Sequence, residues 1–184
     1  MDAKKALTES EGDLDRAFEL LRERGLAAAA KRSDRDASEG AIGSYLHVQA
    51  DRPVSGVLVE LVSETDFVAK SPEFLAAARD IAMHVAWGKP SWTHRDEVPE
   101  EIVAKEAELI SKQAENEGKP EHIIPKIIEG RLESFFKEHV LSDQVFANSG
   151  KFDGTVDELV KQLAARMGEN ISIRRFARLT IGEE

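Results

Sequence analysis

A short segment between a buried strand and a capped helix constrains this chain more than any other feature. Residues 57–62 form a dense aliphatic run, which predicts a mostly buried strand. Ser71 and Pro72 are typical of a helix start, with a hydroxyl N-cap followed by proline at the first helical position. The residues between them must therefore form a short loop, and this loop carries Asp66 beside Phe67.

An aromatic side chain in this loop has two interpretations. Phe67 can fold back over the edge of the core, which is the commoner role of an aromatic residue after a strand. Alternatively, a tight loop that holds Phe67 between Asp66 and Val68 presents a rigid apolar side chain to another molecule. Position and spacing alone do not decide between these interpretations.

Composition and charge narrow the classes of function. At 184 residues the chain is long enough for one domain with a core and a small appendage. Its net charge of −10 argues against a nucleic-acid-binding protein, because phosphate binding requires concentrated lysine and arginine. The chain has no cysteine, and no apolar run approaches the roughly 18 residues that span a bilayer. We expect a cytoplasmic protein that meets a protein partner rather than a membrane or nucleic acid.

The first 40 residues predict a small helical module and a linker. Residues 2–9 are typical of one helix, and a second helix follows the N-cap Asp13 and ends at Gly25, a C′ glycine. Two such short helices cannot bury both of their apolar stripes against each other, so we expect a third helix that this chain lacks. The chain then divides into a truncated helical module, a linker and a core domain: residues 1–30, 31–39 and 40–184.

The remaining residues predict an α+β fold. Apolar runs and alternation predict three strands, over residues 41–49, 56–63 and 171–181. Helical apolar spacing predicts amphipathic helices over residues 72–87, 100–117, 121–140 and 156–167. The short connection between the first two strands favours a hairpin. We predict a three-stranded antiparallel sheet with these helices on one face.

The first strand has two different sides. One side is mainly aliphatic, with Ile42, Ser44, Leu46 and Val48. The other side carries Tyr45 and His47. We expect the face with Tyr45, His47 and Phe176 to be left uncovered by helices and to form the interface of a noncovalent homodimer.

No motif in the sequence indicates catalysis. The chain contains no GxSxG, HExxH or GxxxxGK[ST] pattern and no cluster with metal-ligand spacing. His84 lies four residues after Asp80, a spacing that more often gives a surface contact than an acid–base pair. We therefore predict a protein that is not an enzyme and needs no cofactor or metal.

The segment Thr65-Asp66-Phe67-Val68-Ala69-Lys70 is similar to the characteristic loop of bacterial elongation factor Ts. Further blocks resemble this family in the same order, among them Gly43-Ser44-Tyr45-Leu46-His47 and residues 168–176. The chain is identified as a short member of the family. The N-terminal helices resemble the second and third helices of the family's ubiquitin-associated-like module, whose first helix is absent here through truncation or a late start.

The resemblance implies a guanine-nucleotide exchange factor that acts on elongation factor Tu, in the form of a homodimer. The inserted loop would consist of Thr65, Asp66, Phe67 and Val68. Phe67 would wedge beside the nucleotide site of the partner and dislodge its Mg²⁺, which promotes GDP release. Further partner contacts would come from His47, Lys4 and Met1. The alternative is a scaffold module that binds a partner without promoting exchange.

Overall fold

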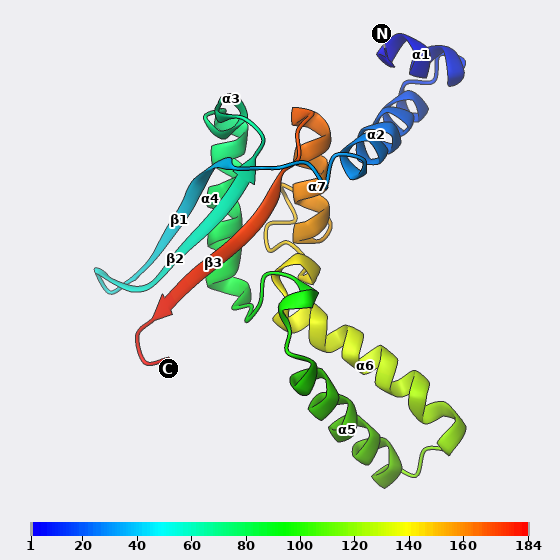
Figure 1. Ribbon diagram of the computed structural model, residues 1–184, viewed down its shortest axis with the longest axis vertical. Coiled ribbons are helices and arrows are strands. Elements are labelled where there is room, and N and C mark those ends of the chain that lie inside the picture. Colours follow the sequence, from blue (N-terminus) through cyan, green and yellow to red (C-terminus); the bar gives the residue numbers. More distant parts are fainter. Residues whose placement is uncertain (1, 184) are drawn as a thin grey trace. The chain divides into compact units, whose positions relative to one another are not determined.

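The computed structural model describes residues 2–183, and within this range it has the predicted α+β composition (Figure 1). The strands are β1 (Glu39–Gln49), β2 (Arg52–Ser63) and β3 (Ser172–Thr180). The α-helices are α1 (Asp2–Glu9), α2 (Leu14–Ala30), α3 (Asp66–Ala69), α4 (Pro72–Gly88), α5 (Glu100–Asn116), α6 (Ile124–His139) and α7 (Val156–Met167). Three single turns of 3₁₀-helix join them: η1 (Arg95–Glu97), η2 (Glu121–Ile123) and η3 (Leu141–Asp143).

The three strands form one antiparallel sheet in the order β1-β2-β3, which confirms the predicted topology. Ala50 and Asp51 join β1 to β2, and both have positive φ angles, of 49° and 62°. Positive φ at both central residues is the geometry of a type I′ turn, whose twist suits a hairpin. The second strand is predicted to start at residue 56, but β2 begins at Arg52 and includes Pro53. The register shifts where Val48 pairs with Pro53, and this bulge accommodates the proline.

The chain divides into two compact units, each described here by itself. The first contains the residues up to Met83 and those from Glu158 onward, and the second contains His84–Asp157. The sheet and the first part of α4 belong to the first unit. Helices α5 and α6, which the sequence analysis assigns to the layer over the sheet, belong to the second unit and pack against each other as a helical hairpin.

One face of the sheet, the inner face, packs against α4. Val59 is fully buried, and it pairs with Gly43 on one side and with Phe176 on the other. A Cβ atom on Gly43 would lie 2.1 Å from the carbonyl oxygen of Ala78 in α4, so the helix backbone approaches the strand closely at this point. Tyr45, two residues along β1, lies on the same face as Gly43.

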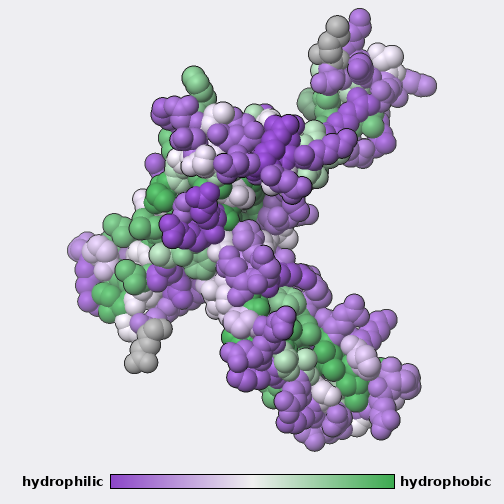
Figure 2. All heavy atoms as spheres, in the orientation of Figure 1, coloured by the Kyte–Doolittle hydropathy of each residue, from purple (hydrophilic) through white to green (hydrophobic). Residues whose placement is uncertain are grey.

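The prediction that Tyr45, His47 and Phe176 mark an uncovered face is therefore wrong, because their side chains share the inner face. The opposite face, called the outer face below, carries Ile42, Ser44, Leu46, Val48, Leu58, Ala177 and Leu179. The ion pair of Glu60 with Arg175 lies on the same face, beside Ile42. The large aliphatic side chains of the outer face are more than half exposed. In Figure 2 hydrophobic residues, in green, lie among hydrophilic ones over the sheet.

The N-terminal helices follow the predicted pattern with one exception. Asp13 caps α2 as predicted, since its carboxylate accepts a hydrogen bond of 3.0 Å from the backbone N–H of Arg16. The predicted end of the helix at Gly25 is wrong, because α2 continues to Ala30. A Cβ atom on Gly25 would lie 3.3 Å from the Cβ of Ala165, so this glycine serves a close helix contact.

Candidate functional site

The residues that the sequence analysis treats as a loop form the one-turn helix α3. Thr65 is its N-cap and accepts a hydrogen bond of 3.4 Å from the backbone N–H of Val68. Ala69 is buried and anchors the turn to the rest of the first unit. The error has a physical reason. A hydroxyl N-cap and a buried residue four positions later suffice for one turn, which is too short to show apolar periodicity.

Phe67 is the most exposed aromatic side chain in the part of the chain that the structure describes, at 86% of its full surface. This exposure rules out the interpretation in which Phe67 folds back over the core. In Figure 2 a green, hydrophobic projection stands where Figure 1 labels α3. An aromatic ring held in water on an ordered helical turn is the arrangement expected of a binding anchor.

Asp66 is the first residue of α3, and its side chain stabilises the turn. Its carboxylate lies 2.5 Å from the Nζ of Lys70, an ion pair one turn along the chain. The hydrogen bond to Lys70 lowers the pKa of Asp66 and raises the pKa of Lys70, so both groups stay charged at neutral pH. Next to this pair, Ser71 caps α4 as predicted and accepts a hydrogen bond of 3.3 Å from the backbone N–H of Phe74.

Two residues that sequence reasoning did not single out hold the base of α3. The carboxylate of Glu169 accepts hydrogen bonds from residues 64 and 65, which lie more than 100 positions earlier in the chain. Asn170 in turn donates its backbone N–H to the carboxylate of Glu64, over 2.7 Å. Their only signal in the sequence is their place in the family-like block at residues 168–176.

The other predicted contact residues lie away from α3. His47 is exposed in β1, and its Nδ1 is 3.3 Å from the hydroxyl of Tyr45. The pairing of Glu39 with Ser63 places α3 at the opposite end of β1, and eight residues of strand correspond to about 26 Å. Lys4 is exposed on α1, whereas Met1 lies outside the described residues.

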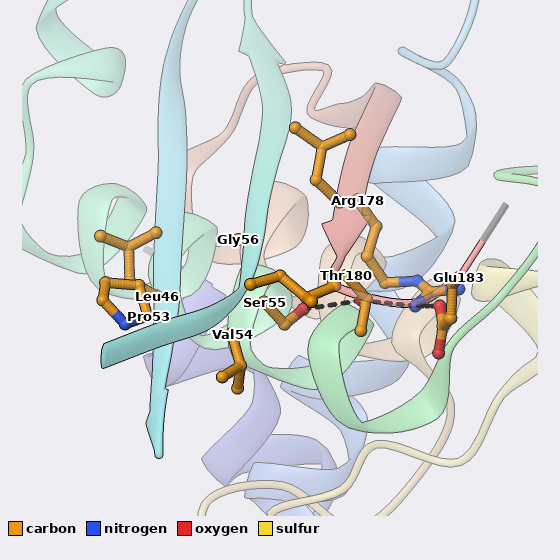
Figure 3. Close-up of a pocket in the computed structure, with 10 residues that line it drawn as sticks. Leu46, Pro53, Val54, Ser55, Gly56, Arg178, Thr180 and Glu183 are labelled. Carbon is orange, nitrogen blue, oxygen red and sulfur yellow. Dashed lines mark hydrogen bonds and ion pairs between the residues drawn. The ribbon is translucent and has the colours of Figure 1, made fainter. Parts of the chain in front are cut away.

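A shallow hollow with a volume of about 440 Å³ lies at the far end of the sheet (Figure 3). The hydroxyls of Ser55 and Thr180 are 3.0 Å apart across it, and the guanidinium of Arg178 donates to Thr180 over 3.0 Å. Arg178 also forms an ion pair with Glu183. These polar groups satisfy one another, while Leu46 lines the apolar side of the hollow.

Within residues 2–183, no group of three or more histidine, aspartate or glutamate side chains is arranged to hold a metal ion. Likewise, none of the described helices combines the length and the apolar character that a membrane crossing requires.

Comparisons with known proteins identify the family of the chain. Residues 27–153 match the family model described as elongation factor TS. The chain is 52% identical to elongation factor Ts of Acetivibrio thermocellus over 183 residues, which is all of this chain and 83% of the relative. It is 50% identical to elongation factor Ts of Carboxydothermus hydrogenoformans, covering 82% of that protein, and 48% identical to that of Thermosipho melanesiensis, covering 91%. The chain belongs to the elongation factor Ts family.

Membership of the elongation factor Ts family confirms the resemblance drawn from the sequence, and it assigns the chain to protein biosynthesis, as a translation elongation factor. The region that matches the family model includes α3 and His47. The matches to full-length elongation factor Ts proteins extend over the whole chain, and so include Lys4 and Glu169.

Proposed function

We propose that this protein is a guanine-nucleotide exchange factor that binds elongation factor Tu and promotes the release of GDP from it. The observation that carries this proposal is the exposure of Phe67 at the tip of α3, within the sequence Thr65-Asp66-Phe67-Val68. In this role the protein acts by binding and not as an enzyme. It works in the cytoplasm, where translation takes place.

The structure of α3 suits insertion into a partner. The N-cap Thr65 and the ion pair between Asp66 and Lys70 hold the turn before any partner arrives. Preorganisation of this kind reduces the entropy that is lost on binding, so more of the burial energy of Phe67 remains for the complex. Val68 is half-buried beside Phe67 and supports the base of the wedge.

The proposed mechanism acts on a metal ion of the partner. Phe67 inserts beside the nucleotide site of elongation factor Tu and shifts the residues that surround Mg²⁺. Because Mg²⁺ requires near-ideal octahedral oxygen geometry, a small shift of its ligands weakens its binding and that of the nucleotide phosphates. Binding linkage then requires that GDP weaken the binding of this protein to the same degree.

His47, Lys4 and Met1 supply secondary contacts in this proposal. Because His47 lies about 26 Å along the sheet from α3, contacts at both places require a partner that extends along the whole strand. A surface of this extent is common in stable protein complexes. Each of these contacts is expected to contribute less than the central aromatic anchor.

We also propose that two copies of the chain associate through the outer face. Ile42, Leu46, Leu58 and Leu179 are 59%, 64%, 53% and 80% exposed on adjacent strands. Exposed apolar patches of this kind mark interaction sites, and a sheet face can pack against a second sheet about 10 Å away. A second copy offers such a face with matching apolar residues, and a two-fold axis makes it self-complementary.

Release of labelled GDP from elongation factor Tu tests the proposed function. Adding this protein is expected to accelerate release, and excess Mg²⁺ is expected to oppose the acceleration. Binding to elongation factor Tu should be weaker when GDP is present than when it is absent. Equal affinity with and without GDP, together with unchanged release, would identify a scaffold that binds without exchange.

A further inference from the structure

One carboxylate holds the backbone that leads into α3. The Oε2 of Glu169 accepts hydrogen bonds from the backbone N–H groups of Glu64, over 3.1 Å, and Thr65, over 3.0 Å. The Oε1 of Glu169 accepts from the hydroxyl of Thr65 over 2.5 Å. Because the Thr65 hydroxyl donates its hydrogen bond to Glu169, the lone pairs of the Thr65 oxygen are free to accept from the backbone N–H of Val68.

The contacts are reciprocal. A carboxylate oxygen of Glu64 accepts a hydrogen bond of 2.7 Å from the backbone N–H of Asn170. The side-chain amide of Asn170 donates to the carbonyl oxygens of Ser33, over 3.0 Å, and Arg35, over 2.7 Å. Three segments distant in sequence therefore meet at the entry to α3: the residues after α2, the end of β2 and the turn after α7.

The turn after α7 is a firm base for these contacts. Leu163 and Ala164 in the last two turns of α7 are buried, and Gly168, with φ of +75°, ends the helix in the left-handed conformation. Glu169 follows directly and is only half-buried. Its hydrogen bonds to N–H groups are charge-assisted, which makes them stronger than neutral ones.

We propose that Glu169 is a positioning residue for Phe67, and this inference rests on the proposed exchange function. With 86% of its surface exposed, Phe67 gains little orientation from contacts of its own ring. Its direction comes from the backbone of α3, which the buried Ala69 fixes at one end and Glu169 fixes at the other. Glu169 thus sets the angle at which the aromatic wedge meets its partner.

Three variants of the full chain test this inference in the GDP release assay. Glu169→Ala is expected to lower the stimulated release by roughly tenfold, the change that about 1.4 kcal/mol produces. Glu169→Gln retains one acceptor oxygen for the two N–H groups, so it should recover most of this loss. Glu73→Ala is the matched control, because it removes a carboxylate that pairs with Arg166 of α7 but does not contact the entry to α3.

Hydrogen exchange of the free chain provides a second readout that needs no partner. In Glu169→Ala the amides of residues 64–70 should exchange faster. The melting temperature should stay within about 2 °C of that of Glu73→Ala, because each variant is expected to lower the free energy of unfolding by a similar small amount. Unchanged exchange of these amides would overturn the inference, and so would full GDP release in Glu169→Ala.

The two proposals fail in different ways. If Phe67→Ala leaves GDP release intact, the proposed exchange site is wrong, and hydrogen exchange alone then decides whether Glu169 positions α3. If Phe67→Ala abolishes release while Glu169→Ala does not change it, the exchange site stands and the role of Glu169 is wrong.

Discussion

At the scale of single residues, the orientation of Phe67 depends on its neighbours in and around α3, which a cap, an ion pair and burial hold in place. Thr65 caps the turn, Asp66 pairs with Lys70, and Ala69 is buried beneath the helix. The aromatic ring is left with 86% of its surface in water. A side chain in this position contributes little to the stability of its own chain.

Replacing Phe67 with alanine should therefore separate function from stability. Truncation of a central binding anchor costs ~2 to 4 kcal/mol. This loss corresponds to roughly 30- to 1,000-fold in affinity. We expect Phe67→Ala nearly to abolish stimulated GDP release from elongation factor Tu. Because the residue is exposed, the free energy of unfolding should change by no more than about 0.5 kcal/mol.

Trp87→Ala is a matched control for this variant, since Trp87 is also a largely exposed aromatic residue, at 72%. It should leave GDP release close to that of the unmodified chain. If Phe67→Ala instead unfolds the protein, and release per folded molecule survives, the wedge mechanism is wrong.

His84 shows how burial selects one protonation state. Its Nδ1 accepts a hydrogen bond of 3.1 Å from the backbone N–H of Ala147, so its Nε2 carries the proton and donates to the Oε1 of Gln144 over 2.9 Å. Gln144 is held in this orientation because its amide nitrogen donates to the carbonyl oxygens of Gly88 and Glu138. A second proton on His84 would point at the N–H of Ala147.

The stability of the chain should therefore depend on pH through His84. Burial lowers the pKa of His84 below its ordinary value of 6.5, and the hydrogen bond to Gln144 opposes this only in part. The unfolded chain then binds more protons than the folded chain between the two pKa values, so stability rises with pH over this interval. The contribution is complete above about pH 6.5 and is lost as the pH falls through the folded pKa.

Urea unfolding between pH 5 and pH 8 measures this effect. His84→Gln should flatten the dependence on pH below about 6.5. An identical dependence in His84→Gln and in the unmodified chain would contradict the assignment.

At the scale of elements, the packing of α4 on β1 depends on the glycine at position 43, which has no side chain. The backbone of Ala78 approaches Gly43 so closely that a Cβ on Gly43 would lie 2.1 Å from its oxygen. Val59, which pairs with Gly43, is fully buried, so the α4 backbone cannot move aside without disturbing the core. The contact fixes which face of the sheet the helix covers.

Gly43→Ala should accordingly destabilise the fold by about 3 kcal/mol or more, at the upper end of overpacking effects. Gly130→Ala is the opposite control, because Gly130 lies inside α6 with no atom within 4 Å of the added Cβ. It should stabilise the chain by about 0.5 to 1 kcal/mol through helix propensity. Denaturant unfolding compares the two, and equal effects would disprove the close contact.

At the scale of the whole molecule, an acidic chain carries an apolar sheet face. A net charge of −10 opposes nonspecific association, so a dimer must gain enough from the outer face to overcome this repulsion. Four large aliphatic residues of this face, Ile42, Leu46, Leu58 and Leu179, are each more than half exposed. The proposed association through them is expected to be noncovalent and to depend on concentration, because the chain has no cysteine.

Leu46→Glu should disrupt this dimer. It places an unpaired carboxylate in the interface from each copy, and leaving such a charge uncompensated costs about 3 to 5 kcal/mol. The dissociation constant should rise by more than about 100-fold. Light scattering at tens of micromolar measures the molar mass. Leu109→Glu, the same change at an exposed leucine of α5, should leave the dimer intact. A strictly monomeric unmodified chain would contradict the proposed association.

The sequence by itself determined the elements of this fold and the position of the candidate site between two of them. Alternating and helical apolar spacing act over a few neighbours, and they identified the three strands and four longest helices of the core to within a few residues. The same local reasoning located Phe67 between a buried strand and the cap at Ser71. It could not show whether the ring lies in the core or in water.

Only the tertiary structure decided the remaining features, because each depends on residues far apart in sequence. Alternation separates the two sides of β1 but does not say which side a helix covers, and the close approach of Ala78 to Gly43 selects the side with Tyr45. Likewise, Glu169 reaches Thr65 across 104 positions of sequence. A hydrogen bond of this kind leaves no periodic signal, since it exists only after the sheet has brought β3 beside β2.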